Sequence, residues 1–289
     1  MAVVNTNIAA SLAQASLMKN ERALGTAMEQ LSTGKKINSA GDNAAGLAIS
    51  TRMSSQIRGL DAAIRNANDA ISMVNTAEGA LDEITAMLQR MRELGVQAAT
   101  GTTDSADRTY LQAEFAALRT EIDRIADNTK WNGRNILDGS AGGSAGASTV
   151  AFGIGQDGTA AQALSTSFGN FSATTSGALS GLASKVITGT TIASAIATSA
   201  SAVAEIDIVI GDVSSQRATF GAVSNRLTHA VDNLTNVKTN SEAARSRILD
   251  TDYASATSEL ARTQIIQQAG TAMLAQANSL PATVLALLQ

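Results

Sequence analysis

The chain has 289 residues, of which 44% are hydrophobic, only 3% aromatic and 16% charged, and its formal net charge is −4. It has no cysteine and one histidine, His229, which excludes disulfides, cysteine-ligated metals and metal sites built on two histidines. The slight acidic excess disfavours a nucleic-acid partner, because binding to phosphates needs a basic surplus. A single proline in a chain of this length favours long uninterrupted helices over a loop-rich sandwich or barrel.

The N-terminal segment is predicted to form an amphipathic helix. The polar stretch 38–43 separates it from the next helix, whose N-cap is expected to be Asp42 or Asn43. No basic region precedes an apolar core, so we expect no cleaved signal peptide. No stretch approaches the roughly 18 consecutive apolar residues of a membrane span. The large apolar residues of this first helix recur on one seam: Ile8, Leu12, Leu17, Leu24, Met28 and Leu31.

A second, much longer helix is predicted over residues 44–98. At Glu78, Leu81 and Ile84 the apolar stripe of this helix steps by three residues twice in succession. This spacing predicts that the helix pair is locally overwound there. A third helix is expected over residues 105–128. Before Glu78, apolar residues step alternately by three and four, as in a helix packed along a neighbour: Ile57, Leu60, Ile64, Ala67, Ile71 and Val74.

The middle of the chain has a different composition. Half of the residues between 139 and 202 are Gly, Ser or Thr, and only Asp157 and Lys185 are charged. Turn signals at 131–134 and short apolar pieces between 149 and 175 predict one or two small β-hairpins. Residues 153–158 (GIGQDG) match G-x-G-x-x-G, but no acidic residue follows about 20 positions later, so a hairpin turn is favoured over a dinucleotide site.

The last part of the chain is again helical in pattern. Along residues 206–248, apolar and small residues alternate by three and four over six heptads, which predicts a long helix antiparallel to the one over 44–98. Pro281 lies inside the final run and is expected to kink it or begin a new turn. That final run consists of Met273, Ala277, Leu280, Val284 and Leu287.

The sequence offers no credible active site. His229 lies beside the seam at a solvent-facing position, and no ordered partner for catalysis can be assigned to it, so we interpret it as an exposed surface histidine. Acidic residues stand three or four positions from arginines, as in Glu121 and Arg124, which is typical of a solvated helix face. We therefore expect no enzyme activity, no metal and no cofactor.

The two ends of the chain are instead candidate association surfaces. They are amphipathic and weakly charged, and neither has a core of its own. They can pair with each other in one domain and can also pair with neighbouring copies, and a contact that does not close generates an open helical filament. The candidate polymerisation residues are Ile8, Leu12, Leu17, Leu24, Met28, Leu31, Met273, Leu280, Val284 and Leu287.

Several motifs resemble those of bacterial flagellins. On the N-terminal side they are residues 31–38 (LSTGKKIN), 42–50 (DNAAGLAIS), 65–72 (RNANDAIS) and 89–97 (QRMRELGVQ). Near the C-terminus they are residues 246–252 (SRILDTD) and 276–288 (QANSLPATVLALL). The resemblance covers residues 1–138 and 206–289 in order, with Met91 and Gly95 as small departures, and leaves out the short middle.

The resemblance implies a mainly α fold, a long antiparallel helical rod or coiled coil with a small β-hairpin region in the middle of the chain. Residues 1–43 and 247–289 are expected to form an inner domain that polymerises and lines a filament channel. Residues 44–246 are expected to form a helical rod domain with hairpins. Within it, residues 139–202 would be a short variable region on the outer side.

The resemblance also implies a function, that of a structural subunit that self-assembles into the extracellular bacterial flagellar filament for swimming motility. Its implied partners are other copies of itself, the flagellar export apparatus, an export chaperone, and the filament cap and junction proteins, with no nucleic acid and no membrane. The chain would be exported without a cleaved signal peptide.

Two further sites are expected. The resemblance implies that a host Toll-like receptor 5 reads a patch of the monomer made by Gln89, Arg90, Glu93, Leu94 and Glu114. Serine and threonine are dense in the middle of the chain, where apolar periodicity is lacking, so outward O-glycosylation sites are expected there. The candidates are Ser172, Thr174 and Thr175.

Two alternatives remain open from the sequence. A hook–filament junction protein of the same superfamily would share the terminal helices but assemble in few copies. A cytosolic coiled-coil scaffold would form a finite oligomer inside the cell. Long filaments made of this chain alone would argue against the first, and intact chain in sheared extracellular material would exclude the second.

Overall fold

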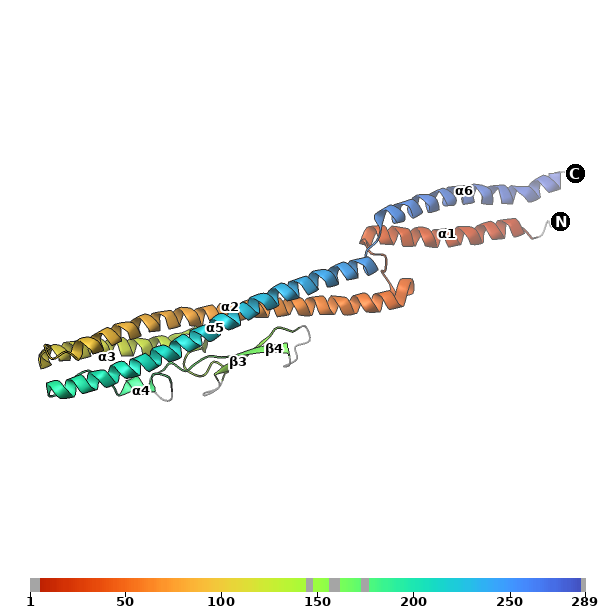
Figure 1. Ribbon diagram of the computed structural model, residues 1–289. Coiled ribbons are helices and arrows are strands. Elements are labelled where there is room, and N and C mark those ends of the chain that lie inside the picture. The colour runs from red at the N-terminus through yellow and green to blue at the C-terminus, as the bar shows by residue number, and fades with distance from the viewer. Residues whose placement is uncertain (1–5, 144–147, 156–161, 173–176, 287–289) are drawn as a thin grey trace. The chain divides into compact units, whose positions relative to one another are not determined.

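A computed structural model describes residues 6–143, 148–155, 162–172 and 177–286, with the side chains of 280–286 left out (Figure 1). The fold is mainly α with two small antiparallel hairpins, as predicted. The helices are α1 Ile8–Thr33, α2 Ala40–Ala98, α3 Ser105–Asn128, α4 Ser180–Ala183, α5 Ile192–Leu249 and α6 Tyr253–Ala286. The strands are β1 Lys130–Trp131, β2 Arg134–Asn135, β3 Thr149–Gly153 and β4 Ala163–Ser167.

The chain divides into two compact units. One contains Met1–Ile57 and Thr239–Gln289, and the other contains Arg58–Lys238. Both boundaries lie inside long helices, so they fall further into α2 and α5 than the domain boundaries expected from the sequence.

In the first unit, α1 and α6 run antiparallel and side by side (Figure 1). The Asn20 side chain is 8% exposed and donates from Nδ2 to the carbonyl oxygen of Thr263 at 2.8 Å. Asn7 donates in the same way to Ala277, also at 2.8 Å. Because a buried amide without a partner is costly, these two bonds fix how α1 is aligned along α6.

The N-cap of the second helix is confirmed at Asn43. Its backbone is non-helical, with φ −164°, and its side-chain oxygen accepts from the Gly46 amide at 2.8 Å. Asp42 instead accepts from the amides of Asn38 and Ser39, so its carboxylate orders the turn that precedes the helix. These bonds hold the pKa of Asp42 below its ordinary value, with the Ser39 amide contributing most.

The second unit has a single core made by α2, α3, α5 and the hairpin region. The predicted seams point inward: Leu81 and Ile84 of α2 and Val213 of α5 are fully buried. Phe115 of α3 is buried as well. By length and hydropathy alone α5 also qualifies as a membrane span. Its inward apolar residues at alternating three- and four-residue steps are those of a helix packed on other helices.

Three ion pairs fix the antiparallel register of α2 and α5. Asp61 pairs with Lys238 at 2.7 Å, Asp82 with Arg217 at 3.0 Å, and Arg92 with Asp207 at 2.7 Å. The steps between pairs are equal on the two helices: 21 residues separate the first pair from the second, and ten separate the second from the third. The antiparallel pairing expected from the sequence is therefore confirmed.

The predicted start of the last long helix, at residue 206, was wrong. The helix begins at Ile192, inside the segment judged to be an irregular Gly, Ser and Thr-rich middle. Thr191 and Ser194 cap it reciprocally, each side-chain oxygen accepting from the other residue's amide. The first turns bury the small residues Ala195, Ser199 and Ala202, so the composition hid a helix whose buried face is nearly free of large side chains.

The two hairpins occur where turn signals predicted them. Asn132, with φ 48°, and Gly133, with φ 79°, join β1 to β2. Strands β3 and β4 pair antiparallel, so the G-x-G-x-x-G motif begins at the end of a hairpin strand and not in a βαβ unit; residues 156–161 lie outside the described part. Phe168 packs on Phe220 of α5, with ring centroids 5.0 Å apart, and this contact holds the hairpin region against the helices.

Candidate functional site

Within the described residues, no group of three or more His, Asp or Glu side chains could hold a metal ion. Several acidic side chains form ion pairs with arginines at the surface, such as Glu121 with Arg124. His229 is exposed, as expected. The features that can act on a partner are three surfaces.

The first surface, called the outward apolar face of the terminal helix pair, is the set of large apolar side chains that the pair leaves exposed: Ile8, Leu12, Met18, Met28, Ile265, Ile266 and Met273. Leu12 is 68% exposed and Met273 is 66% exposed. Leu12 and Met273, together with Leu17 and Gly270, line a shallow apolar groove that runs between α1 and α6. A Cβ atom at Gly270 would lie 2.6 Å from Leu17 Cδ2, so a larger residue there would displace the Leu17 side chain.

The predicted polymerisation residues divide into two sets. Leu17, Leu24 and Leu31 are partly buried, whereas Ile8, Leu12, Met28 and Met273 are exposed. The side chains of Leu280 and Val284 are outside the described part, as is the whole of Leu287. The terminal segments therefore pair with each other and still leave a large apolar face uncovered, which is the arrangement that a contact with another copy requires.

The second surface is the candidate receptor patch at the end of α2, and here one residue was wrongly placed. Gln89, Arg90, Glu93 and Glu114 are exposed, but Leu94 is 0% exposed. Leu94 continues the inward seam that runs through Leu88 and Met91, so it belongs to the core of the second unit and cannot anchor a contact at the surface.

The exposed part of the patch is an ion-pair network. Arg90 donates from Nε to Glu114 Oε1 at 2.9 Å and from Nη1 to Glu93 Oε2 at 3.0 Å. The hydrogen bond with Glu114, followed by that with Glu93, raises the pKa of Arg90 above its already high ordinary value. The guanidinium is therefore permanently charged, and it ties the end of α2 to α3.

The candidate glycosylation site at Ser172 is contradicted. Ser172 is 5% exposed, and its amide donates to Asn170 Oδ1 at 3.0 Å. The neighbouring Phe168 and Phe171 are buried, and they draw this stretch of chain into the core. The density of hydroxyl residues predicted an outward segment, but the two buried aromatic side chains decide where Ser172 lies. Thr174 and Thr175 lie outside the described residues.

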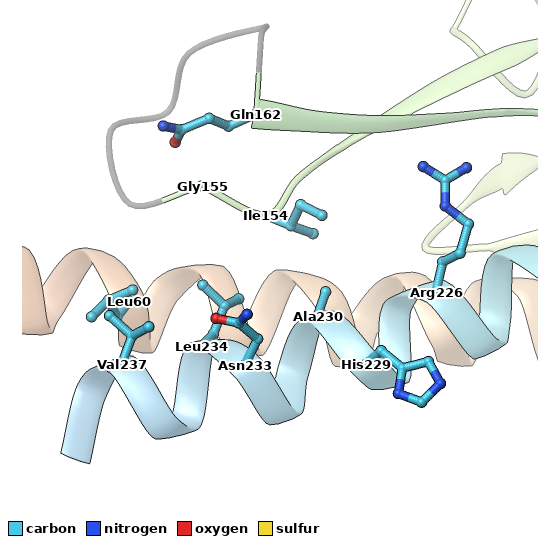
Figure 2. Close-up of a pocket in the computed structure, with 10 residues that line it drawn as sticks. All are labelled: Leu60, Ile154, Gly155, Gln162, Arg226, His229, Ala230, Asn233, Leu234 and Val237. Carbon is cyan, nitrogen blue, oxygen red and sulfur yellow. The ribbon is translucent and has the colours of Figure 1, made fainter. Parts of the chain in front are cut away.

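The third surface is a groove in the second unit between α5 and the residues next to strands β3 and β4 (Figure 2), with a volume of about 680 Å³. Ile154, Gly155 and Gln162 come from the hairpin region, Leu60 comes from α2, and the other lining residues come from α5. Arg226 extends from α5 toward the hairpin, whereas His229 points away from it (Figure 2). The lining residues are Leu60, Ile154, Gly155, Gln162, Arg226, His229, Ala230, Asn233, Leu234 and Val237.

Two family models cover most of the chain. The bacterial flagellin N-terminal helical region matches residues 4–142, and the bacterial flagellin C-terminal helical region matches residues 203–288. The chain therefore belongs to the bacterial flagellin family. It is a structural subunit that self-assembles into the extracellular flagellar filament, and it is not an enzyme. The junction-protein and cytosolic-scaffold alternatives are not favoured.

Curated relatives agree over the whole length. The chain is 43% identical over 287 residues to a flagellin of Halalkalibacterium halodurans, covering 99% of this chain and 100% of the relative. It is 36% identical over 375 aligned residues to flagellin A of Vibrio cholerae, covering 99% of each. Since this chain has 289 residues, the Vibrio protein contains stretches that this chain lacks.

Solved structures also resemble it. A putative flagellar hook-associated protein from Vibrio parahaemolyticus shares the fold with a TM-score of 0.57 and 14% identity, covering 72% of this chain and all of that one. A crystal structure of Bacillus cereus flagellin is 31% identical, with a TM-score of 0.48, covering 63% of this chain and 94% of that one.

Proposed function

We propose that this flagellin polymerises through the outward apolar face of the α1–α6 pair. The observation that carries the proposal is the exposure of Ile8, Leu12, Met28 and Met273 on two helices whose inner sides are already occupied by each other. Fully burying one such side chain is worth about 1.5–3 kcal/mol, so a contact that covers several of them drives assembly strongly.

The test replaces Leu12 and Met273 by serine, singly, and measures the critical concentration for filament formation by sedimentation. Each replacement is expected to raise it about ten-fold, because about 1.4 kcal/mol of apolar burial is lost. The matched control is Ile208→Ser, since Ile208 is 59% exposed but lies on α5 in the second unit. Equal effects of all three replacements would contradict the proposal, and circular dichroism of the monomers checks that they remain folded.

The terminal segments, residues 1–43 and 247–289, are further proposed to line the channel of the filament. Flagellin-like motifs at both ends support this assignment. The same motifs support three further proposals: export through the flagellar apparatus without a cleaved signal peptide, binding of a chaperone to the C-terminal segment, and assembly beneath a cap next to junction proteins. Co-purification of the chaperone with the full chain but not with a chain lacking 247–289 is the expected result.

A host receptor of the Toll-like receptor 5 type is proposed to read the exposed network of Gln89, Arg90, Glu93 and Glu114 in the monomer. Support comes from their exposure and fixed geometry. In the filament this face is expected to be covered, so depolymerised protein should bind the receptor and intact filaments should not. Thr174 and Thr175 remain proposed glycan sites, and an intact mass equal to that of the bare polypeptide would remove them.

A further inference from the structure

The groove between α5 and the β3–β4 hairpin is apolar inside and has a cation at its edge. Leu60, Ile154 and Leu234 present aliphatic side chains to it, and Arg226 reaches across from α5 (Figure 2). Among the described residues no carboxylate pairs with Arg226. An occupant that suits this groove has a flat apolar body with a negative charge next to it.

The outer face of α3 carries such a feature. Asp107, Tyr110 and Glu114 step by three and four residues and so share one side of the helix. Tyr110 is 75% exposed, more than any other large hydrophobic side chain in the described part of the chain. Glu114 is engaged by Arg90, whereas no ion pair of the described residues occupies the Asp107 carboxylate.

The groove and the tyrosine cannot meet within one copy. Glu114 is bonded to Arg90, which sets the level of the tyrosine along α2, while Leu60 of the same helix lines the groove. Thirty residues of α2 separate Leu60 from Arg90, which is about 45 Å at 1.5 Å per residue. A contact between the two surfaces must therefore join two copies.

We propose that the groove binds Tyr110 of a second copy of this chain, with the ring among Leu60, Ile154 and Leu234 and with Asp107 paired to Arg226. Because the contact uses two different surfaces of the same protein, each added copy leaves one groove and one tyrosine free, so the contact can continue along an open filament. The proposal rests on the proposed function of the chain as a filament subunit, but the groove contact does not involve the terminal helices. A buried tyrosine contributes 150–250 Å² of contact area, enough to make it an anchor of the interface.

The first experiment uses the absence of cysteine from the chain. Filaments are assembled from a variant with Tyr110→Cys and Asn233→Cys, since Asn233 lines the groove, and are treated with a short bis-maleimide. A ladder of covalent oligomers on a denaturing gel is expected. The matched control is Thr109→Cys with Asn233→Cys, because Thr109 is exposed on the same helix but about 100° around its axis. Well-formed filaments that give no more cross-linking than this control would overturn the proposal.

A second experiment is a charge exchange, which also decides the question if the cysteine variant fails to assemble. Arg226→Glu and Asp107→Arg are each expected to raise the critical concentration about ten-fold, and the double variant to recover most of the loss. Monomer unfolding measured in parallel separates assembly from folding. No recovery in the double variant overturns the groove contact. Loss of filaments only in the α1–α6 variants, with Arg226→Glu and Asp107→Arg assembling normally, also overturns it and leaves the proposed role of the terminal helices intact.

Discussion

At the scale of the residue, Leu94 and Arg90 show how little sequence distance says about environment. They are four positions apart in α2, yet Leu94 is 0% exposed and Arg90 forms a surface network with Glu93 and Glu114. A helical turn is 3.6 residues, so residues four apart are displaced around the axis, and here the edge of the buried stripe runs between them. Arg108 is the reverse case, a charged side chain that is 2% exposed.

Arg108 is buried because it completes the end of a helix. It donates from Nε to the carbonyl oxygen of Ala98 at 3.2 Å and from Nη2 to that of Thr100 at 3.0 Å. The last carbonyls of a helix have no partner within the helix, and a cation near them also interacts favourably with the helix dipole. Sequence reasoning missed this residue, because nothing local distinguishes it from the exposed arginines.

The residue-scale prediction compares Leu94→Ala with Arg90→Ala. Leu94→Ala should lower the free energy of unfolding of the monomer by about 2–5 kcal/mol, because it leaves a cavity in the core. Arg90→Ala should cost less than about 1 kcal/mol, because exposed ion pairs contribute little. Urea unfolding followed by circular dichroism measures both. If receptor binding by folded monomer fell only for Arg90→Ala, the corrected patch would be supported; comparable stability losses would contradict the assignment of Leu94 to the core.

At the scale of the element, the seam between α2 and α5 combines aliphatic burial with ion pairs that set the register. Small and aliphatic side chains would tolerate a slip of one heptad, whereas a slip would separate Asp82 from Arg217 and Arg92 from Asp207. Arg217 also bonds Glu78 at 2.7 Å, and this bond is the main cause that raises the pKa of the guanidinium. Glu78 is the residue at which the seam changes its spacing.

The element-scale prediction concerns Arg217→Glu, which places three carboxylates together beside the seam. It should destabilise the monomer by about 1–3 kcal/mol through repulsion and lost pairing, and Asp82→Arg in the same chain should recover part of this loss. The comparison is Arg124→Glu, which breaks an exposed pair on a single helix and should change stability by less than about 1 kcal/mol. Thermal unfolding with equal midpoints for Arg217→Glu and Arg124→Glu would show that the pair does not hold the register.

At the scale of the whole molecule, the two compact units differ in how much of their apolar surface is buried within one copy of the chain. The unit of residues 58–238 buries a continuous core that includes Phe115 and Phe220. The unit of residues 1–57 and 239–289 has few fully buried apolar side chains, among them Ala27 and Ile37, and exposes many large ones. Folding of residues 58–238 is therefore expected to be independent of assembly. The unit of residues 1–57 and 239–289 is expected to gain much of its burial from neighbouring copies.

The corresponding prediction is that a chain lacking residues 247–289 forms no filaments but keeps the fold of residues 58–238. Removal of α6 takes away the partner of α1 and the hydrogen-bond acceptor of Asn20. Sedimentation should show no polymer, and urea unfolding should still show one cooperative transition with the core residues protected from hydrogen exchange. Filaments of normal stability from this chain would refute a role for the terminal helices in polymerisation.

The sequence by itself determined the long helices, the turn at Asn132 and Gly133, and a cap at either Asp42 or Asn43, because these depend on spacing and local backbone preference. Family motifs at both ends determined membership of the flagellins. Only the tertiary structure decided that α5 begins at Ile192, since packing of small residues against a neighbour has no strong periodic signal.

Tertiary structure likewise decided which polar and apolar residues are reachable. Ser172 is buried because Phe168 and Phe171 pull its segment inward, Leu94 is buried because it continues the α2 seam, and Arg108 is buried because helix-end carbonyls need donors. The groove with Arg226 joins α2, α5 and a hairpin that are distant in sequence. Such properties depend on which segments meet, and a pattern along one segment carries no information about the surface that will cover it.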